Sequence, residues 1–181
     1  MCARGGAEYN ALLLFFWVET SRPNDEILEE VSRTLVQRIE KFSAQSVSNI
    51  LYAFALMGYQ PNQQLMDIVG KHAAVSISAY EPQSISLLLW AFSRLNIAAP
   101  VSLVYAVETE FSKALEDFKP LELNNLLHGY ARLQPNPDVR FLKALARRCV
   151  GMDQLSHSRV ISVVFNSGFF SLLPLRLGAR N

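Results

Sequence analysis

The sequence predicts an all-α protein, a right-handed α-solenoid of about four to five two-helix repeats of 38 residues each. The first observation is a recurrence: the segment Phe42 to Gly58 returns at Tyr80 to Asn96 and again at Phe118 to Gln134, in two steps of 38 residues. The second is that each copy carries apolar residues at the i, i+3, i+4, i+7 spacing of one helical face. The third is that a second apolar segment, opened by proline, follows the earlier copies.

The opening segment of every repeat is predicted to be an α-helix with one buried face. That face consists of Val47, Ile50, Leu51, Phe54 and Met57 in the first copy, Ile85, Leu88, Leu89, Phe92 and Leu95 in the second, and Leu123, Leu126, Leu127, Tyr130 and Leu133 in the third. Pro82 and Pro120 fall just inside the start of their helices, where an N–H would have no intrahelical acceptor. These residues are the predicted core.

A second helix is predicted in the remainder of each repeat, for example within Pro61 to Ala74 and Pro100 to Leu115. Its apolar positions are Leu65, Ile68, Val69 and Ala73 in one repeat and Leu103, Ala106, Val107 and Phe111 in the next. Two helices cannot bury both apolar faces alone, so neighbouring repeats must stack. Ala53, Ala91 and Gly129 recur at one phase of the first helices, and their small size is expected to let successive helices approach closely.

The repeats are expected to form a single domain over residues 1–181, as a fragment of a longer array. Their boundaries fall at about 4–41, 42–79, 80–117, 118–154 and a partial 155–181. Counting back 38 residues from Pro61-Asn62 reaches Pro23-Asn24, which predicts a degenerate first repeat whose second helix runs from about Asn24 to Ile39. A fifth copy begins near Leu155, and its pattern fails at Asn166.

The composition argues against several classes of function. Half of the residues are hydrophobic, and the formal net charge of +1 gives no general attraction for a phosphate backbone. Cys2 and Cys149 indicate neither a disulfide framework nor a zinc site. No apolar run reaches the roughly 18 residues needed to cross a bilayer. We therefore expect no membrane insertion.

The residues that enzymes use form no recognisable constellation. The histidines His72, His128 and His157 lack the HExxH spacing, and neither a Gly-rich phosphate loop nor a GxSxG turn occurs. We therefore expect a protein that is not an enzyme and holds no cofactor or metal.

A column of rings, amides and arginines is predicted on the side of the first helices that faces away from the core, at about 100° of rotation per residue. It contains Asn49, Tyr52, Trp90, Arg94, Asn125, His128 and Arg132. Rings stack on bases, amides read base edges and guanidinium groups hold phosphates, so the column indicates a site for single-stranded RNA. The alternative is that the rings pack against the adjacent repeat, as core aromatic residues do, and the arginines are solvated.

A basic ridge is the second candidate for RNA contact. Arg140, Lys143 and Arg147 share one helical face at i, i+3 and i+7, where they could contact phosphates. The alternative is a plain solvated face.

The repeated segments NILYAFALMG, LLLWAFSRLN and LLHGYARLQ resemble the "NLLWALARL" helix of octotricopeptide repeats, whose period they share. They are also similar to the repeat regions of RAP-domain and FAST-kinase-like organellar proteins, and to the helical subunits of the mitochondrial RNA-editing substrate-binding complex. The resemblance covers roughly residues 10 to 168. It implies an RNA-binding factor that acts in organellar RNA processing, stability or translation, in post-transcriptional regulation.

The same resemblance implies a mitochondrial or plastid location, although Met1 to Asn10 carries no visible targeting signal. Its expected partners are a single-stranded organellar transcript and other proteins of an RNA-processing complex. The competing class is a non-enzymatic α-solenoid scaffold that binds proteins, which the near-neutral charge favours.

Overall fold

The computed structural model describes residues 24–130 and 138–150, and over these residues the chain is all-helical with no strand. The α-helices are α2 (Asp25–Arg38), α3 (Ala44–Met57), α4 (Gln63–Val75), α5 (Pro82–Arg94), α6 (Val101–Phe111), α7 (Pro120–Tyr130) and α8 (Val139–Val150). Three short 3₁₀ helices join them: η1 (Ile39–Lys41), η2 (Ile77–Ala79) and η3 (Leu115–Asp117). The all-α class and the paired helices of residues 42–117 are thus confirmed.

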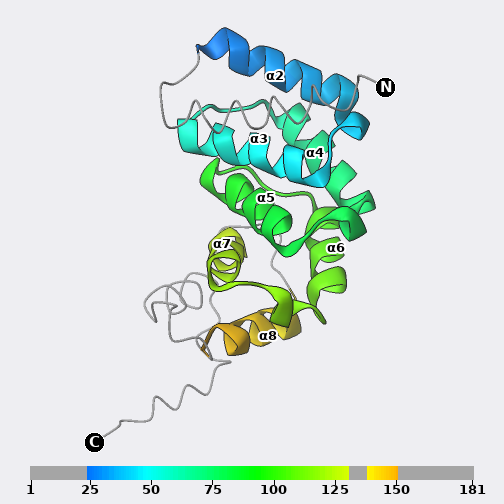
Figure 1. The fold of residues 1–181 in the computed structure, drawn as a ribbon, viewed down its shortest axis with the longest axis vertical. Coiled ribbons are helices and arrows are strands. Elements are labelled where there is room, and N and C mark those ends of the chain that lie inside the picture. The colour runs from blue at the N-terminus through cyan, green and yellow to red at the C-terminus, as the bar shows by residue number, and fades with distance from the viewer. Residues whose placement is uncertain (1–23, 131–137, 151–181) are drawn as a thin grey trace, which may run out of the picture.

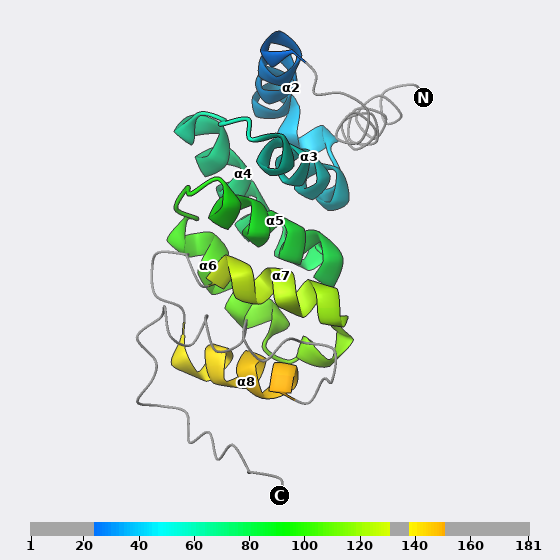
Figure 2. The same ribbon diagram turned by 90° about the vertical axis from the view of Figure 1, so that its left-hand side faces the viewer.

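The first helices of successive repeats lie side by side. α3 packs against α5 and α5 against α7, and these three form the layer that faces the viewer in Figure 2. Behind it α4 packs against α6, and α2 packs against α4 (Figure 1). α8 lies at the opposite end of the described helices from α2, where it contacts α7 and η3. The helices therefore form two layers.

The predicted apolar face of the first helices is the core. Its buried members are Val47, Ile50, Leu51, Phe54, Ile85, Leu88, Leu89, Phe92, Leu95, Leu123, Leu126, Leu127 and Tyr130. From the second helices, Leu65, Val69, Ala73, Leu103, Val107 and Phe111 are buried as well. Met57, Ile68 and Ala106 are only half-buried. The burial of the aromatic position occupied by Phe54, Phe92 and Tyr130 confirms the predicted phase of the first helices.

The starts of the second helices recur with the period of the sequence. Asn24 caps α2 by accepting a hydrogen bond from the Ile27 N–H at 3.1 Å, and Asn62 caps α4 by accepting one from the Leu65 N–H at 2.8 Å. Such a cap satisfies a backbone donor that the helix itself cannot pair. Pro100 stands at the same phase before α6. The starts of α2, α4 and α6 therefore repeat with the period, through a side-chain cap at Asn24 and Asn62 and a proline without one at Pro100.

Close helix approach depends on two glycines. A Cβ added to Gly129 in α7 would lie 3.0 Å from Leu89 Cβ, and one added to Gly70 in α4 would lie 2.6 Å from the Pro100 ring. Ala53 and Ala91, at the phase of Gly129, are fully buried. The expectation that small residues at this phase allow close packing is confirmed for Gly129.

Several predicted elements lie outside the described residues: the first helix of repeat 4–41, the end of the first helix of repeat 118–154 with its predicted core residue Leu133, and the fifth copy from Leu155 onward. Among the helices that are described, none combines the length and apolar character needed to span a membrane.

Candidate nucleic-acid interface

The three predicted rings form one continuous column across the first layer. The ring centroids of Tyr52 in α3 and Trp90 in α5 are 4.9 Å apart, with the ring planes tilted by 51°. The centroids of Trp90 and His128 in α7 are 6.0 Å apart at 36°. Because α3, α5 and α7 are stacked in register, residues 38 positions apart meet side by side.

All three rings are half-buried. Trp90 packs partly against the core. The arrangement therefore combines the two expectations: each ring contacts a ring of a neighbouring repeat, and each keeps part of its surface open. Their spacing adds a restriction, because a base held between two rings would need a carbon–carbon separation of about 3.5 Å on either side, or about 7 Å in all. A base would therefore have to meet the open edges and faces of the column, because the spaces between its rings are too narrow.

A buried serine fixes the orientation of His128. The Ser93 hydroxyl donates to the His128 carbonyl oxygen at 3.1 Å and lies 3.3 Å from His128 Nδ1. Since its single proton is used for the carbonyl, the hydroxyl oxygen can accept from Nδ1 when that ring nitrogen carries a hydrogen. Sequence analysis missed Ser93. Its signal was a serine beside Phe92 at a position where the first copy has Ala55.

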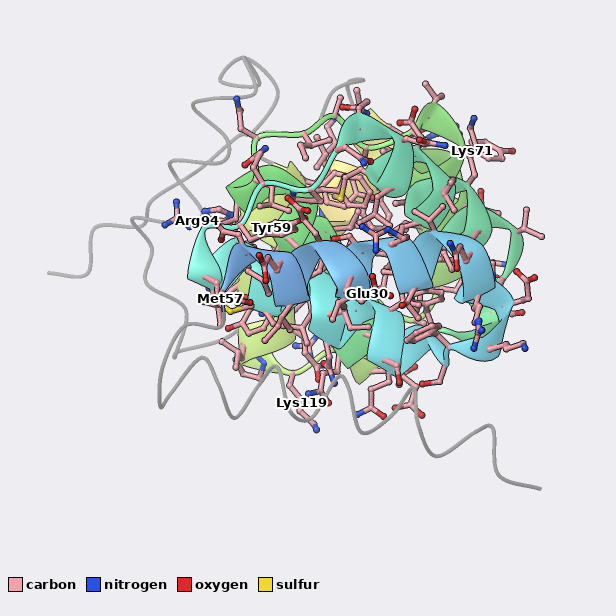
Figure 3. All side chains as sticks on the ribbon, turned by 90° about the horizontal axis from the view of Figure 1, so that it is seen from above. Glu30, Met57, Tyr59, Lys71, Arg94 and Lys119 are labelled. Atoms are coloured by element: carbon pink, nitrogen blue, oxygen red, sulfur yellow. The ribbon has the colours of Figure 1, made fainter. Side chains whose placement is uncertain are left out.

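The other predicted members of the column differ in exposure. Asn49 and Asn125 are half-buried, and Arg94 is exposed. Figure 3 shows Arg94 at the edge of the molecule, on a different side from Lys71 of α4. Arg132 lies outside the described residues. The structure thus places two amides and one guanidinium on the helices that carry the rings.

The face that carries the rings holds little formal charge. α3 has no charged residue, α5 has only Arg94, and the carboxylate of Glu122 in α7 is buried, where it accepts the Lys119 N–H at 2.8 Å. Apolar side chains are open there instead: Leu56 is 43% and Leu121 is 70% exposed. Contacts with this face must therefore be made mainly by rings, amides and aliphatic groups.

The predicted ridge lies on α8, a different helix from those of the column. Arg140 is exposed and its guanidinium is 3.3 Å from the Asp138 carboxylate, Lys143 is half-buried, and Arg147 is exposed. The next residue, Arg148, lies beside the ridge, and its Nε is 3.0 Å from a Glu116 carboxylate oxygen. The ridge is therefore not electrostatically uniform.

No group of three or more His, Cys, Asp or Glu side chains suited to a metal ion occurs within the ranges that the structure describes. Cys149 in α8 is a free thiol, 1% exposed, and burial raises its pKa to about 11. At neutral pH this thiol is protonated and packs as an apolar group.

Comparison with known proteins shows which family this chain belongs to. A family model described as "Tbc2 translation factor, N-terminal domain" matches residues 10–166, nearly the whole span of the repeats. A comparison with curated proteins gave no match. Since the family match covers most of the chain, the protein belongs to the family of the Tbc2 translation factor N-terminal domain.

Proposed function

We propose that this chain is an RNA-binding helical-repeat domain that acts in the translation, processing or stability of an organellar transcript, and that it catalyses no reaction. The family description supports a role in translation. The resemblance to octotricopeptide repeats supports single-stranded RNA as the ligand, a mitochondrial or plastid location, and a right-handed α-solenoid as the complete array. The observation that carries the proposal is the column of Tyr52, Trp90 and His128.

The column suits an unpaired strand because it continues across three helices and each of its rings keeps part of its surface open. Stacking of a base on an aromatic side chain contributes about 1–3 kcal/mol, and the partial exposure of these rings favours the lower end. Asn49 and Asn125 lie on the same helices, one on each side of α5, and their amides can donate to and accept from base edges. RNA held this way has its bases toward the column, so its affinity depends only weakly on salt.

The test is a triple substitution, Tyr52→Ala, Trp90→Ala and His128→Ala, with binding of a random-sequence single-stranded RNA as the measurement. We expect the affinity to fall about tenfold or more, because three stacking surfaces are removed. Tyr105→Ala is the matched control, since Tyr105 is a 70% exposed aromatic residue on α6 in the other layer. Equal affinities for the folded triple variant and the control would reject the column as the RNA site.

A second candidate function is supported by the composition of the same face. Interfaces between proteins are depleted of charge and enriched in aromatic residues at their centre. On the helices that the structure describes, this face has rings, Leu56 and Leu121, and Arg94 is its one formal charge. The scaffold hypothesis therefore assigns the column to a protein partner. It predicts that the triple variant loses a partner protein while RNA affinity stays unchanged.

A further inference from the structure

The cations near the end of α8 line a pocket that the sequence did not reveal. A cavity of about 430 Å³ lies between the end of α6, η3 and α8, and its lining includes Lys113, Glu116, Arg147 and Arg148. Three cationic side chains thus surround it against one carboxylate. Because Lys113 follows α6 while the arginines belong to α8, the fold, not the local sequence, brings them together.

The one carboxylate in this lining, that of Glu116, already forms an ion pair. Arg148 Nε lies 3.0 Å from Glu116 Oε2, and its guanidinium also donates to the Leu115 and Glu116 carbonyl oxygens at 3.4 Å. These contacts hold the Arg148 side chain, which is 21% exposed, against η3. Lys113 and Arg147 are exposed and, within the described ranges, form no ion pair. The pocket therefore keeps a net positive charge with two cations free to meet a ligand.

The other end of α8 has the opposite character. Arg140 lines a neighbouring cavity of about 420 Å³ together with Glu108 and Asp138, and it pairs with Asp138. Desolvation by burial raises the pKa of Glu108. The hydrogen bond from the Asp138 N–H lowers this pKa, and the charge of Asp138 raises it. An anion would meet two carboxylates there. The predicted ridge is thus divided, and only its Arg147 end favours an anion.

We propose that the pocket of Lys113, Arg147 and Arg148 binds a phosphate group of the RNA backbone, at a place separate from the ring column. The chemistry required is that of a phosphate: lysine supplies a mobile point charge and arginine a planar pair of donors. That this phosphate belongs to RNA rests on the proposed function. On the described part of the nearly neutral ring face, Arg94 is the one cation, so the RNA backbone lacks other cationic partners there. The pocket supplies the salt-sensitive part of binding.

The experiment uses an abasic oligonucleotide, a single-stranded sugar–phosphate chain without bases. The variant is Lys113→Gln with Arg147→Gln, and the control is Lys71→Gln with Arg38→Gln, which removes two exposed cations from other helices. The pocket variant should bind the abasic chain about fivefold to tenfold more weakly than the wild type. The slope of log affinity against log salt should become shallower by about 0.7, the value for one phosphate contact on a single strand. The control should match the wild type.

Equal losses in the two double variants, or no loss in either, would overturn the proposal. The triple ring variant should bind the abasic chain as the wild type does, so the result stands apart from the test of the column. Binding of inorganic pyrophosphate is measured as well, because it distinguishes a site for a free phosphate compound from a site for the RNA backbone. Should pyrophosphate bind in a Lys113- and Arg147-dependent manner while the abasic chain does not, the pocket would belong to a free phosphate compound and the assignment to RNA would be wrong.

Discussion

Gly129 in α7 lies directly against the backbone of Leu89 in α5. A Cβ at Gly129 would be 3.1 Å from the Leu89 carbonyl carbon and 3.2 Å from its oxygen, as well as 3.0 Å from its Cβ. Backbone atoms in a packed helix cannot move aside as a flexible side chain can. The spacing of α5 and α7, which sets the distance between Trp90 and His128, therefore depends on the absence of a side chain at Gly129.

Gly129→Val should lower the free energy of unfolding by about 1–3 kcal/mol, because the added side chain must push α7 away from α5. Urea denaturation followed by circular dichroism measures the change. Ser102→Val is the control, since it puts the same β-branched residue at an exposed position of α6. A variant as stable as the control would show that α7 can shift without cost.

Tyr130→Phe should be neutral or stabilise the protein by up to about 1 kcal/mol. The Tyr130 hydroxyl is buried and, within the described ranges, has no hydrogen-bond partner. Removing it therefore removes the desolvation cost of a buried, unpaired polar group. The substitution also restores the phenylalanine that Phe54 and Phe92 provide at this phase. Thermal unfolding is the measurement, with the exposed Tyr105→Phe as reference. A clear loss of stability would mean that the hydroxyl has a partner.

Asn62→Ala should destabilise the protein by about 1 kcal/mol, because the Asn62 side chain caps α4 through the Leu65 N–H at 2.8 Å. Denaturant unfolding of this variant is to be compared with that of Gln64→Ala, an exposed position in the first turn of the same helix. Asn62→Ser, which keeps a capping oxygen, should recover most of the loss. No recovery with serine would attribute the effect to something other than the cap.

The fold was largely predictable because burial and capping follow one period. Phe54, Phe92 and Tyr130 are equivalent in the sequence and equivalent in the core, and helix α2 starts one period before α4. What the pattern could not show is how close two copies come. The approach of Gly129 to Leu89 depends on the packing of whole helices, which no local spacing encodes.

The candidate site was predicted only in part, for a related reason. The phase of Tyr52, Trp90 and His128 on the first helices follows from the period, but their contact with one another depends on the helix separation. Ser93 and Lys113 were missed because their roles involve residues about 35 positions away, across a helix interface. Single-helix periodicity places a side chain on a face; it does not identify the neighbour that the side chain meets.

Cys149 should react with thiol reagents far more slowly in the native protein than in the unfolded chain. With a pKa of about 11, only about one thiol in a thousand is ionised at pH 8, and the sulfur is 1% exposed. The measurement is alkylation of a Cys2→Ser variant, in which Cys149 is the sole cysteine. We expect native labelling to be slower than labelling in urea by about a hundredfold or more. Comparable rates would show that the end of α8 opens readily.

Glu108→Gln should stabilise the protein at pH 7 and have less effect near pH 4. Because folding raises the pKa of Glu108 above its ordinary value of 4.5, the folded state holds the proton more tightly than the unfolded state. The contribution of Glu108 is therefore most favourable below that value and is lost as the pH rises through the folded pKa.

Glutamine removes this dependence while its carbonyl oxygen still accepts the Asp138 N–H, which is 2.9 Å from Glu108 Oε1. The gain at pH 7 should stay below about 1 kcal/mol, because the carboxylate is partly solvated. Urea unfolding at the two pH values measures it, and Glu110→Gln, an exposed glutamate of the same helix, is the control. If Glu108→Gln instead destabilised the protein at pH 7 relative to that control, the charged carboxylate would be stabilising the junction of α6 and α8, and folding would not raise the pKa of Glu108.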